Sequence, residues 1–191
     1  MLRRPLPVDR RALLAALALL VTFFAIELSW HRPLFCPCGS VKLWAGAVHG
    51  AENSQQVADW YSPSHIIHGF LLYGLWWLVL PGRMRGWALP LAVLVEGGWE
   101  LLENSPIIID RYRAVTASYG YSGDSILNSM CDIGMMTIGF MVARRLPVWG
   151  TIGTAIFFEL LALAVIRDNL TLNVLMLTYP IDAVRIWQAG V

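Results

Sequence analysis

Long apolar runs are the feature that most constrains what this chain can fold into. An α-helix needs about 20 residues to cross roughly 30 Å of hydrocarbon, and inside lipid a helix satisfies all its own backbone hydrogen bonds. We therefore predict an all-α fold, a polytopic membrane helix bundle with about five transmembrane helices. The expected spans cover residues 12–28, 65–80, 87–103, 125–143 and 148–166.

Composition supports this class. The chain has 191 residues, of which 57% are hydrophobic and 14% charged, and its mean hydropathy is +0.58. A soluble domain of this size does not need so apolar a composition. We expect one integral membrane domain over residues 1–191. The net charge of +1, with basic residues in short clusters, argues against a nucleic-acid partner.

The two ends of the chain carry further signals. Arginines before the first run resemble the start of a signal peptide, but no small-residue cleavage site follows, so we expect an uncleaved anchor. Residues 169–179 are apolar but few, and Pro180 interrupts them. This stretch is expected to be a short C-terminal interfacial helix or half of a sixth span, with the interfacial helix favoured.

Clustered arginines predict the orientation. They lie in the N-terminal tail, around Arg83 and Arg85, and at Arg144 and Arg145. In a five-span chain all three places fall on one side, which the positive-inside rule assigns to the cytoplasm. We expect a bacterial inner-membrane protein with a cytoplasmic N-terminus, and connections 31–64 and 104–124 on the periplasmic side.

Three of the expected helices each carry one polar stripe toward the periplasmic side. Ionisable groups in a membrane helix are costly, which makes such stripes candidate functional sites. The spacings are i, i+3 on the second helix, i, i+4, i+7 on the third and i, i+4, i+8 on the fourth, so each stripe occupies one face. We expect Glu96 and Asp132 to lie one to two turns deeper than the rest. The stripes are His65 and His68; Glu96, Glu100 and Glu103; and Asp124, Asn128 and Asp132.

Imidazoles facing carboxylates are suitable ligands for a divalent metal such as zinc, manganese or iron. The predicted ligands are His65, His68, Glu100 and Asp132, and a spare carboxylate would act as general base. A metal-free site is the alternative, in which the glutamates raise one another's pKa and a histidine is the base. The candidate catalytic residues are Glu100, Glu103, Asp124 and Asn128.

Several of these residues also have purely structural interpretations. His65 and His68 could serve as helix-end residues that hydrogen-bond to loop backbone, and Glu103 could face water at the end of its helix. Asp124 is equally suited to be a helix N-cap, and Asp132 to pair with a histidine.

Two loop features add hypotheses. Cys36 and Cys38 form a Cys-x-Cys pair that suits a soft metal, a structural turn or a tight disulfide. Arg111 and Arg113 are suited to hold a lipid phosphate over the site, although interfacial anchoring is the favoured interpretation.

The segments DWYSPSHIIHGF (59–70), WELLENSP (99–106) and GYSGDSILNS (120–129) resemble a family of uncharacterised alphaproteobacterial multi-pass membrane proteins. The resemblance covers nearly the whole chain and implies an inner-membrane location, but no activity. More remotely, Glu100 followed by Asp124, Asn128, Gly134 and Gly139 resembles the VanZ-like membrane proteins linked to teicoplanin resistance. That similarity implies work on the envelope or its lipids.

Three functions fit these features, with membrane lipids as the expected partners. One is a metal-dependent enzyme acting on a lipid or lipid-linked envelope substrate. The second is a non-catalytic membrane assembly protein whose polar cluster holds helices together. An ion-coupled transporter ranks third, because apolar residues such as Trp76, Leu91 and Ile138 fill the cytoplasmic halves of these helices.

Overall fold

The described residues of the computed structural model, 5–116 and 120–190, form helices joined by loops. The elements are α1 (Arg10–Ser29), α2 (Ser62–Val79), the 3-10 helix η1 (Gly82–Trp87), α3 (Ala88–Glu103), α4 (Pro106–Val115), α5 (Ile126–Ala143), α6 (Val148–Ile166), α7 (Leu170–Thr178) and α8 (Asp182–Gln188). The all-α prediction is confirmed for this part of the chain.

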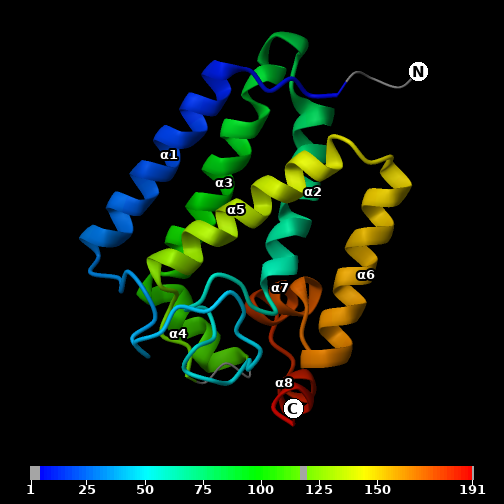
Figure 1. The fold of residues 1–191 in the computed structure, drawn as a ribbon. Coiled ribbons are helices and arrows are strands. Elements are labelled where there is room, and N and C mark those ends of the chain that lie inside the picture. The colour runs from blue at the N-terminus through cyan, green and yellow to red at the C-terminus, as the bar shows by residue number, and fades with distance from the viewer. Residues whose placement is uncertain (1–4, 117–119, 191) are drawn as a thin grey trace.

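Five long helices, α1, α2, α3, α5 and α6, run between two ends of the bundle (Figure 1). One end holds the N-terminal segment, η1 and the turn between α5 and α6. The opposite end holds the loop between α1 and α2 together with α4, α7 and α8. Among the described residues, α1, α5 and α6 are long and apolar enough to cross a membrane. The five long helices agree with the five expected segments to within three residues at each end, and α6 has the expected bounds. That all five cross a membrane stays a prediction.

Helix α2 begins at Ser62, three residues before the expected span. The buried Asp59 fixes the backbone at the start of this helix. Its Oδ1 accepts a hydrogen bond from the Tyr61 N–H at 2.8 Å, and its Oδ2 accepts one from the Ser54 N–H at 3.0 Å. The Asp59 N–H in turn donates to Ser62 Oγ at 3.0 Å. As a result, His65 and His68 lie within the first two turns of the helix.

The connection 104–124, expected as a loop, contains α4. Pro106 occupies its first turn, where a missing N–H costs nothing, and Ile109, Tyr112 and Val115 form its buried face. The period-3 spacing of these three residues within a charged segment is the signal that an apolar-run analysis overlooks.

Helix α7 forms within the apolar stretch expected at 169–179. Its N-terminus is capped twice: Asn169 Oδ1 accepts the Leu172 N–H at 2.8 Å, and Glu159 Oε1 of α6 accepts the Leu170 N–H at 2.9 Å. Glu159 is thus a capping group. With nine residues, α7 is shorter than the roughly 20 needed to cross hydrocarbon.

The closest helix packing is between α2 and α5, and glycines allow it. A Cβ placed on Gly69 would collide with the carbonyl oxygen of Met136, and one on Gly139 with that of Ile66. The two backbones therefore touch, as small residues permit in membrane bundles. Fully buried side chains, among them Val93, Ile133, Met136 and Phe140, fill the core that adjoins this contact.

This contact predicts a position-dependent effect of alanine. Gly69→Ala and Gly139→Ala are each expected to lower the free energy of unfolding by about 2 kcal/mol or more, because the backbones must separate. Gly74→Ala on α2 and Gly134→Ala on α5, whose Cβ positions face open space, serve as controls. They should be neutral or stabilising by up to about 1 kcal/mol through helix propensity. SDS titration of the purified variants measures this, and equal effects at all four glycines would contradict the packing argument.

Candidate functional site

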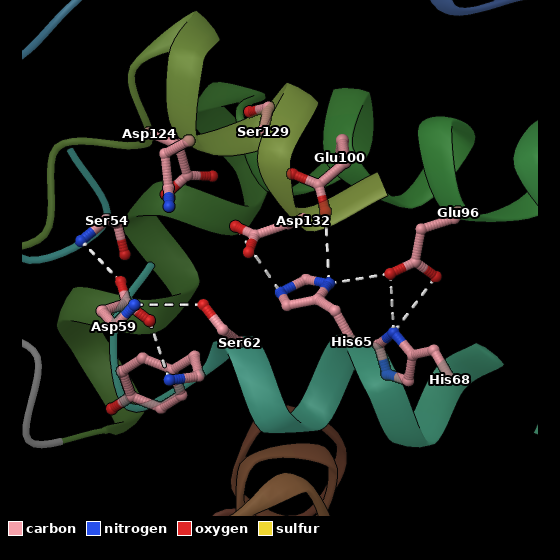
Figure 2. A network of polar contacts seen from close by, with 12 residues as sticks. Ser54, Asp59, Ser62, His65, His68, Glu96, Glu100, Asp124, Ser129 and Asp132 are labelled. Atoms are coloured by element: carbon pink, nitrogen blue, oxygen red, sulfur yellow. Dashed lines mark hydrogen bonds and ion pairs between the residues drawn. The ribbon is translucent and has the colours of Figure 1, made fainter. Parts of the chain in front are cut away.

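Helices α2 and α3 meet through one carboxylate that contacts two imidazoles (Figure 2). Glu96 Oε1 lies 2.7 Å from His65 Nδ1 and 2.9 Å from His68 Nδ1, and Glu96 Oε2 lies 3.1 Å from His68 Nδ1. An ionised carboxylate only accepts, so each ring donates from Nδ1, and a neutral ring keeps Nε2 as an acceptor. Glu96 was expected deeper than the histidines. It lies level with them because α2 starts at Ser62.

Two further carboxylates converge on His65 from α3 and α5. Glu100 Oε1 lies 3.5 Å from His65 Nδ1, and Asp132 Oδ2 lies 3.8 Å from His65 Nε2. Glu100 is 0% exposed and Asp132 5%. Neither oxygen of Glu100, nor Oδ1 of Asp132, has a hydrogen-bond partner among the described residues. Buried carboxylate oxygens normally have hydrogen-bond partners. The side of the cluster formed by Glu100 and Asp132 therefore lacks groups that would compensate its carboxylates.

Asp124 anchors a second polar group nearer the end of the bundle. Its Oδ1 accepts from Tyr121 Oη at 2.9 Å and its Oδ2 from Asn104 Nδ2 at 3.0 Å, while its own N–H donates to Asn104 Oδ1 at 2.6 Å. Burial raises the pKa of the Asp124 carboxyl to about 6. The expectation that Asp124 is an N-cap is wrong, because Ser125 Oγ caps α5 by accepting the Asn128 N–H at 3.2 Å.

Glu103 and Asn128 complete the predicted set. Glu103 is in hydrogen-bonding contact with Trp99 and Tyr112. The Asn128 side chain is 1% exposed and donates from Nδ2 to the carbonyl of Gln56 at 3.0 Å, which holds the α1–α2 loop against α5. This amide therefore has a structural partner, and its catalytic role stays a prediction.

A cavity of about 160 Å³ joins the two polar groups. The structure brings together every predicted ligand and catalytic residue around it, while Glu96 lies behind the histidines. Binding and catalysis by these side chains stay predictions. The predicted residues that line the cavity are His65, His68, Glu100, Glu103, Asp124, Asn128 and Asp132.

Sequence reasoning missed the part of the lining that distant segments supply. Asp59 comes from the α1–α2 loop, and Leu170, Asn173 and Val174 come from α7. The polar Asn173 within an apolar run was the available signal. Its Oδ1 accepts from Tyr112 Oη at 3.0 Å, which ties α7 to α4.

The loop hypotheses are resolved differently. Cys36 and Cys38 form a disulfide. Arg111 Nε donates to the Leu177 carbonyl at 3.0 Å and Arg113 Nε to the Tyr121 carbonyl at 2.6 Å, and neither arginine lines the cavity. These arginines fasten the segments around the site.

The donors present fit a divalent metal. Two triads have ligand atoms within 4.8 Å of one another: His65, His68 and Glu96, and His65, Glu100 and Asp132. In the first triad Glu96 already satisfies both Nδ1 atoms, as a carboxylate behind a metal-binding histidine does. The second triad holds the unpartnered carboxylate oxygens. It is therefore the better place for an ion, and nitrogen with carboxylate oxygen suits zinc, manganese or iron.

Comparison with known proteins places the chain in a family. The family model described as "Protein of unknown function (DUF2585)" matches residues 28–190. A UPF0314 protein of Novosphingobium aromaticivorans is 58% identical over 189 residues, covering 95% of this chain and 94% of that protein. A UPF0314 protein of Sphingopyxis alaskensis is 53% identical over 183 residues, covering 96% and 97%. No solved structure matches. The chain belongs to this family.

The buried Asp124 predicts a pH-dependent stability. Because the folded-state pKa is raised to about 6, the protonated form stabilises the fold, and this contribution is present below about pH 4 and is lost as pH rises through 6. Asp124→Asn, which stays neutral, should remove on the order of 2 kcal/mol of the stability difference between pH 4 and pH 7. SDS titration at both pH values measures it. An unchanged pH dependence in the variant would contradict the assignment.

Proposed function

We propose that this member of the DUF2585 family is a multi-pass inner-membrane protein that holds a divalent metal ion in its buried cavity. We further propose that it hydrolyses a lipid or lipid-linked envelope substrate there. The metal is supported mainly by two buried carboxylates that flank His65: both oxygens of Glu100 and Oδ1 of Asp132 lack hydrogen-bond partners among the described residues. Leaving such charges uncompensated in a low-dielectric interior costs several kcal/mol each.

The predicted ligands then have defined tasks. His65, with His68 as the other predicted nitrogen ligand, would hold such an ion, while both rings donate from Nδ1 to Glu96, which fixes their orientation. Glu100 and Asp132 supply carboxylate oxygen. A bound ion of this class acts as a Lewis acid and lowers the pKa of a coordinated water.

The other end of the cavity supplies proton transfer. Glu103 and Asp124 face the same space, and Tyr121 and Asn104 hold Asp124 in place. With a pKa of about 6, Asp124 both takes and gives up a proton near neutral pH, as a general acid must during departure of an alcohol or phosphate leaving group. Asn128 holds the α1–α2 loop against this end of the cavity through its hydrogen bond to the Gln56 carbonyl.

The membrane arrangement supports an envelope substrate. Arg83 and Arg85 in η1 lie at one end of the bundle with the N-terminal segment, and the cavity lies toward the other end, where α4, α7 and α8 gather (Figure 1). The positive-inside rule then favours five spans, a cytoplasmic N-terminus and a cavity open to the periplasmic side.

Topology reporters test this orientation. Alkaline phosphatase, which is active only outside the cytoplasm, is fused to truncations after Ser40, Arg85 and Arg145. We expect activity after Ser40 alone. If α2 and α3 do not cross, the Arg85 fusion becomes active as well, and an inactive Ser40 fusion would reverse the orientation.

Elemental analysis of detergent-purified protein tests the metal. We expect stoichiometric zinc, manganese or iron in the wild type and none in His65→Ala/His68→Ala. His49→Ala, an exposed loop histidine, is the matched control and should retain the metal. Glu96→Gln should weaken binding by about 10- to 100-fold, because it removes the carboxylate that orients both rings and raises their basicity.

Two outcomes would count against the proposal. Absence of metal in the purified wild type would contradict the proposed metal centre. A double variant that unfolds points instead to the assembly role, since the His65 cluster ties α2, α3 and α5 together. Circular dichroism of each variant separates loss of metal from loss of fold.

A further inference from the structure

Four aromatic side chains line the cavity beyond the proposed ligands. They come from four elements: Tyr61 precedes α2, Trp99 lies on α3, Tyr112 on α4 and Tyr121 before α5. The Tyr112 and Tyr121 rings stack edge to face, with centroids 5.1 Å apart. So dense an aromatic lining is more than a small polar substrate requires.

The tyrosine hydroxyls are engaged by the protein itself. Tyr61 Oη donates to Asp168 at 3.2 Å, Tyr112 Oη to Asn173 at 3.0 Å and Tyr121 Oη to Asp124 at 2.9 Å. These bonds fix the rings in place. What the tyrosines offer a ligand is therefore aromatic surface, whose electron-rich faces attract cations.

The charge of this end is also one-sided. Glu103 and Asp124 line it, and no lysine or arginine belongs to the described lining. The nearby Arg32 lies outside this lining, and its guanidinium donates to the backbone carbonyls of Asp124 and Ser122. Within the cavity an anion would therefore meet two carboxyl groups and no lysine or arginine of the described lining, whereas a positive group would meet complementary charge.

We propose that the end of the cavity formed by Trp99, Tyr112, Tyr121, Glu103 and Asp124 binds an organic ammonium group. Aromatic rings with nearby carboxylates are the usual chemistry for such cations. The inference deepens the proposed function, on which it rests, by naming the class of substrate: a molecule that carries an ammonium group.

A second metal ion fits this end less well. Asp124 uses both carboxylate oxygens to accept from Tyr121 and Asn104, and Glu103 is in contact with Trp99 and Tyr112. Direct coordination would compete with these hydrogen bonds for the carboxylate oxygens. An alkylammonium group needs no inner-sphere ligand, because it interacts through the field of the carboxylates and the faces of the rings.

Isothermal titration of the full-length protein in a non-ionic maltoside detergent, with EDTA present, tests the inference. The probe is choline, and its neutral isostere 3,3-dimethylbutan-1-ol is the comparison ligand. We expect choline to bind in the millimolar range or tighter, and the isostere to bind at least about 5-fold more weakly, because it lacks the charge.

Variants locate the binding. Trp99→Leu removes an aromatic face and Glu103→Gln removes a carboxyl group, and each should weaken choline binding by about 5-fold or more. Trp149→Leu is the control, since Trp149 on α6 is 79% exposed and lies outside the cavity lining. Trp99→Phe, which keeps an aromatic ring, should restore most of the affinity lost in Trp99→Leu. No choline binding, equal binding of the isostere, or equal effects at Trp99 and Trp149 would overturn the inference.

Competition distinguishes a lipid head group from a soluble ammonium compound. Lysophosphatidylcholine displaces bound choline if the site takes a head group, and lysophosphatidylglycerol of the same chain length should not. Displacement by soluble compounds alone supports an ammonium site for a free metabolite. Because EDTA is present, the titration tests choline binding independently of the metal. If the wild type contains no metal but binds choline, only the proposed metal centre is contradicted.

Discussion

The rest of the structure depends on how buried negative charge is compensated around His65. Glu96, Glu100 and Asp132 come from two helices, and each is almost completely withdrawn from solvent. Glu96 accepts from both imidazoles, and no lysine or arginine of the described cavity lining is available to the other two carboxylates. An ion bound between Glu100, Asp132 and His65 would supply the missing charge, so under the proposed function the same residues would serve both stability and binding.

Helix packing sets the geometry of this cluster. Gly69 directly follows His68, and Gly139 touches the carbonyl of Ile66, the neighbour of His65. The close contact between α2 and α5 therefore occurs within one residue of each histidine. It brings Asp132, two turns from Gly139 on α5, within 3.8 Å of His65 Nε2. A bulkier contact would widen the site before it unfolded the bundle, which links two glycines outside the cavity to the ligand distances inside it.

The sequence predicted the parts of this molecule that rest on local periodicity. Apolar run length located the five long helices, and one-face spacing selected seven residues that do line one cavity. It misplaced Glu96 because the start of α2 depends on Asp59, a loop residue whose hydrogen bonds reach back to Ser54. It overlooked α4, whose helical signal is three buried residues within a charged segment.

The remaining part of the site arises from tertiary contacts between distant segments. Asn173 meets Tyr112 across 61 residues, and Gln56 meets Asn128 across 72. No spacing rule connects such pairs, because they depend on how α7 and the α1–α2 loop fold back over the helix ends. These contacts supply the aromatic and amide lining, so this part of the cavity was less accessible from sequence than the charged cluster.

The two ends of the cavity have different electrostatic demands, and together they restrict the ligand. An ion held by His65, Glu100 and Asp132, as proposed, would compensate the inner carboxylates and would attract an anionic oxygen. It does little for Glu103 and Asp124, whose charge is best met by a positive group held against rigid rings. A substrate carrying a phosphoester next to an ammonium group satisfies both ends at once, whereas a simple anion satisfies one and is repelled by the other. If the proposed function holds, the order of charges along the ligand, more than its overall size, would determine which molecule the cavity binds.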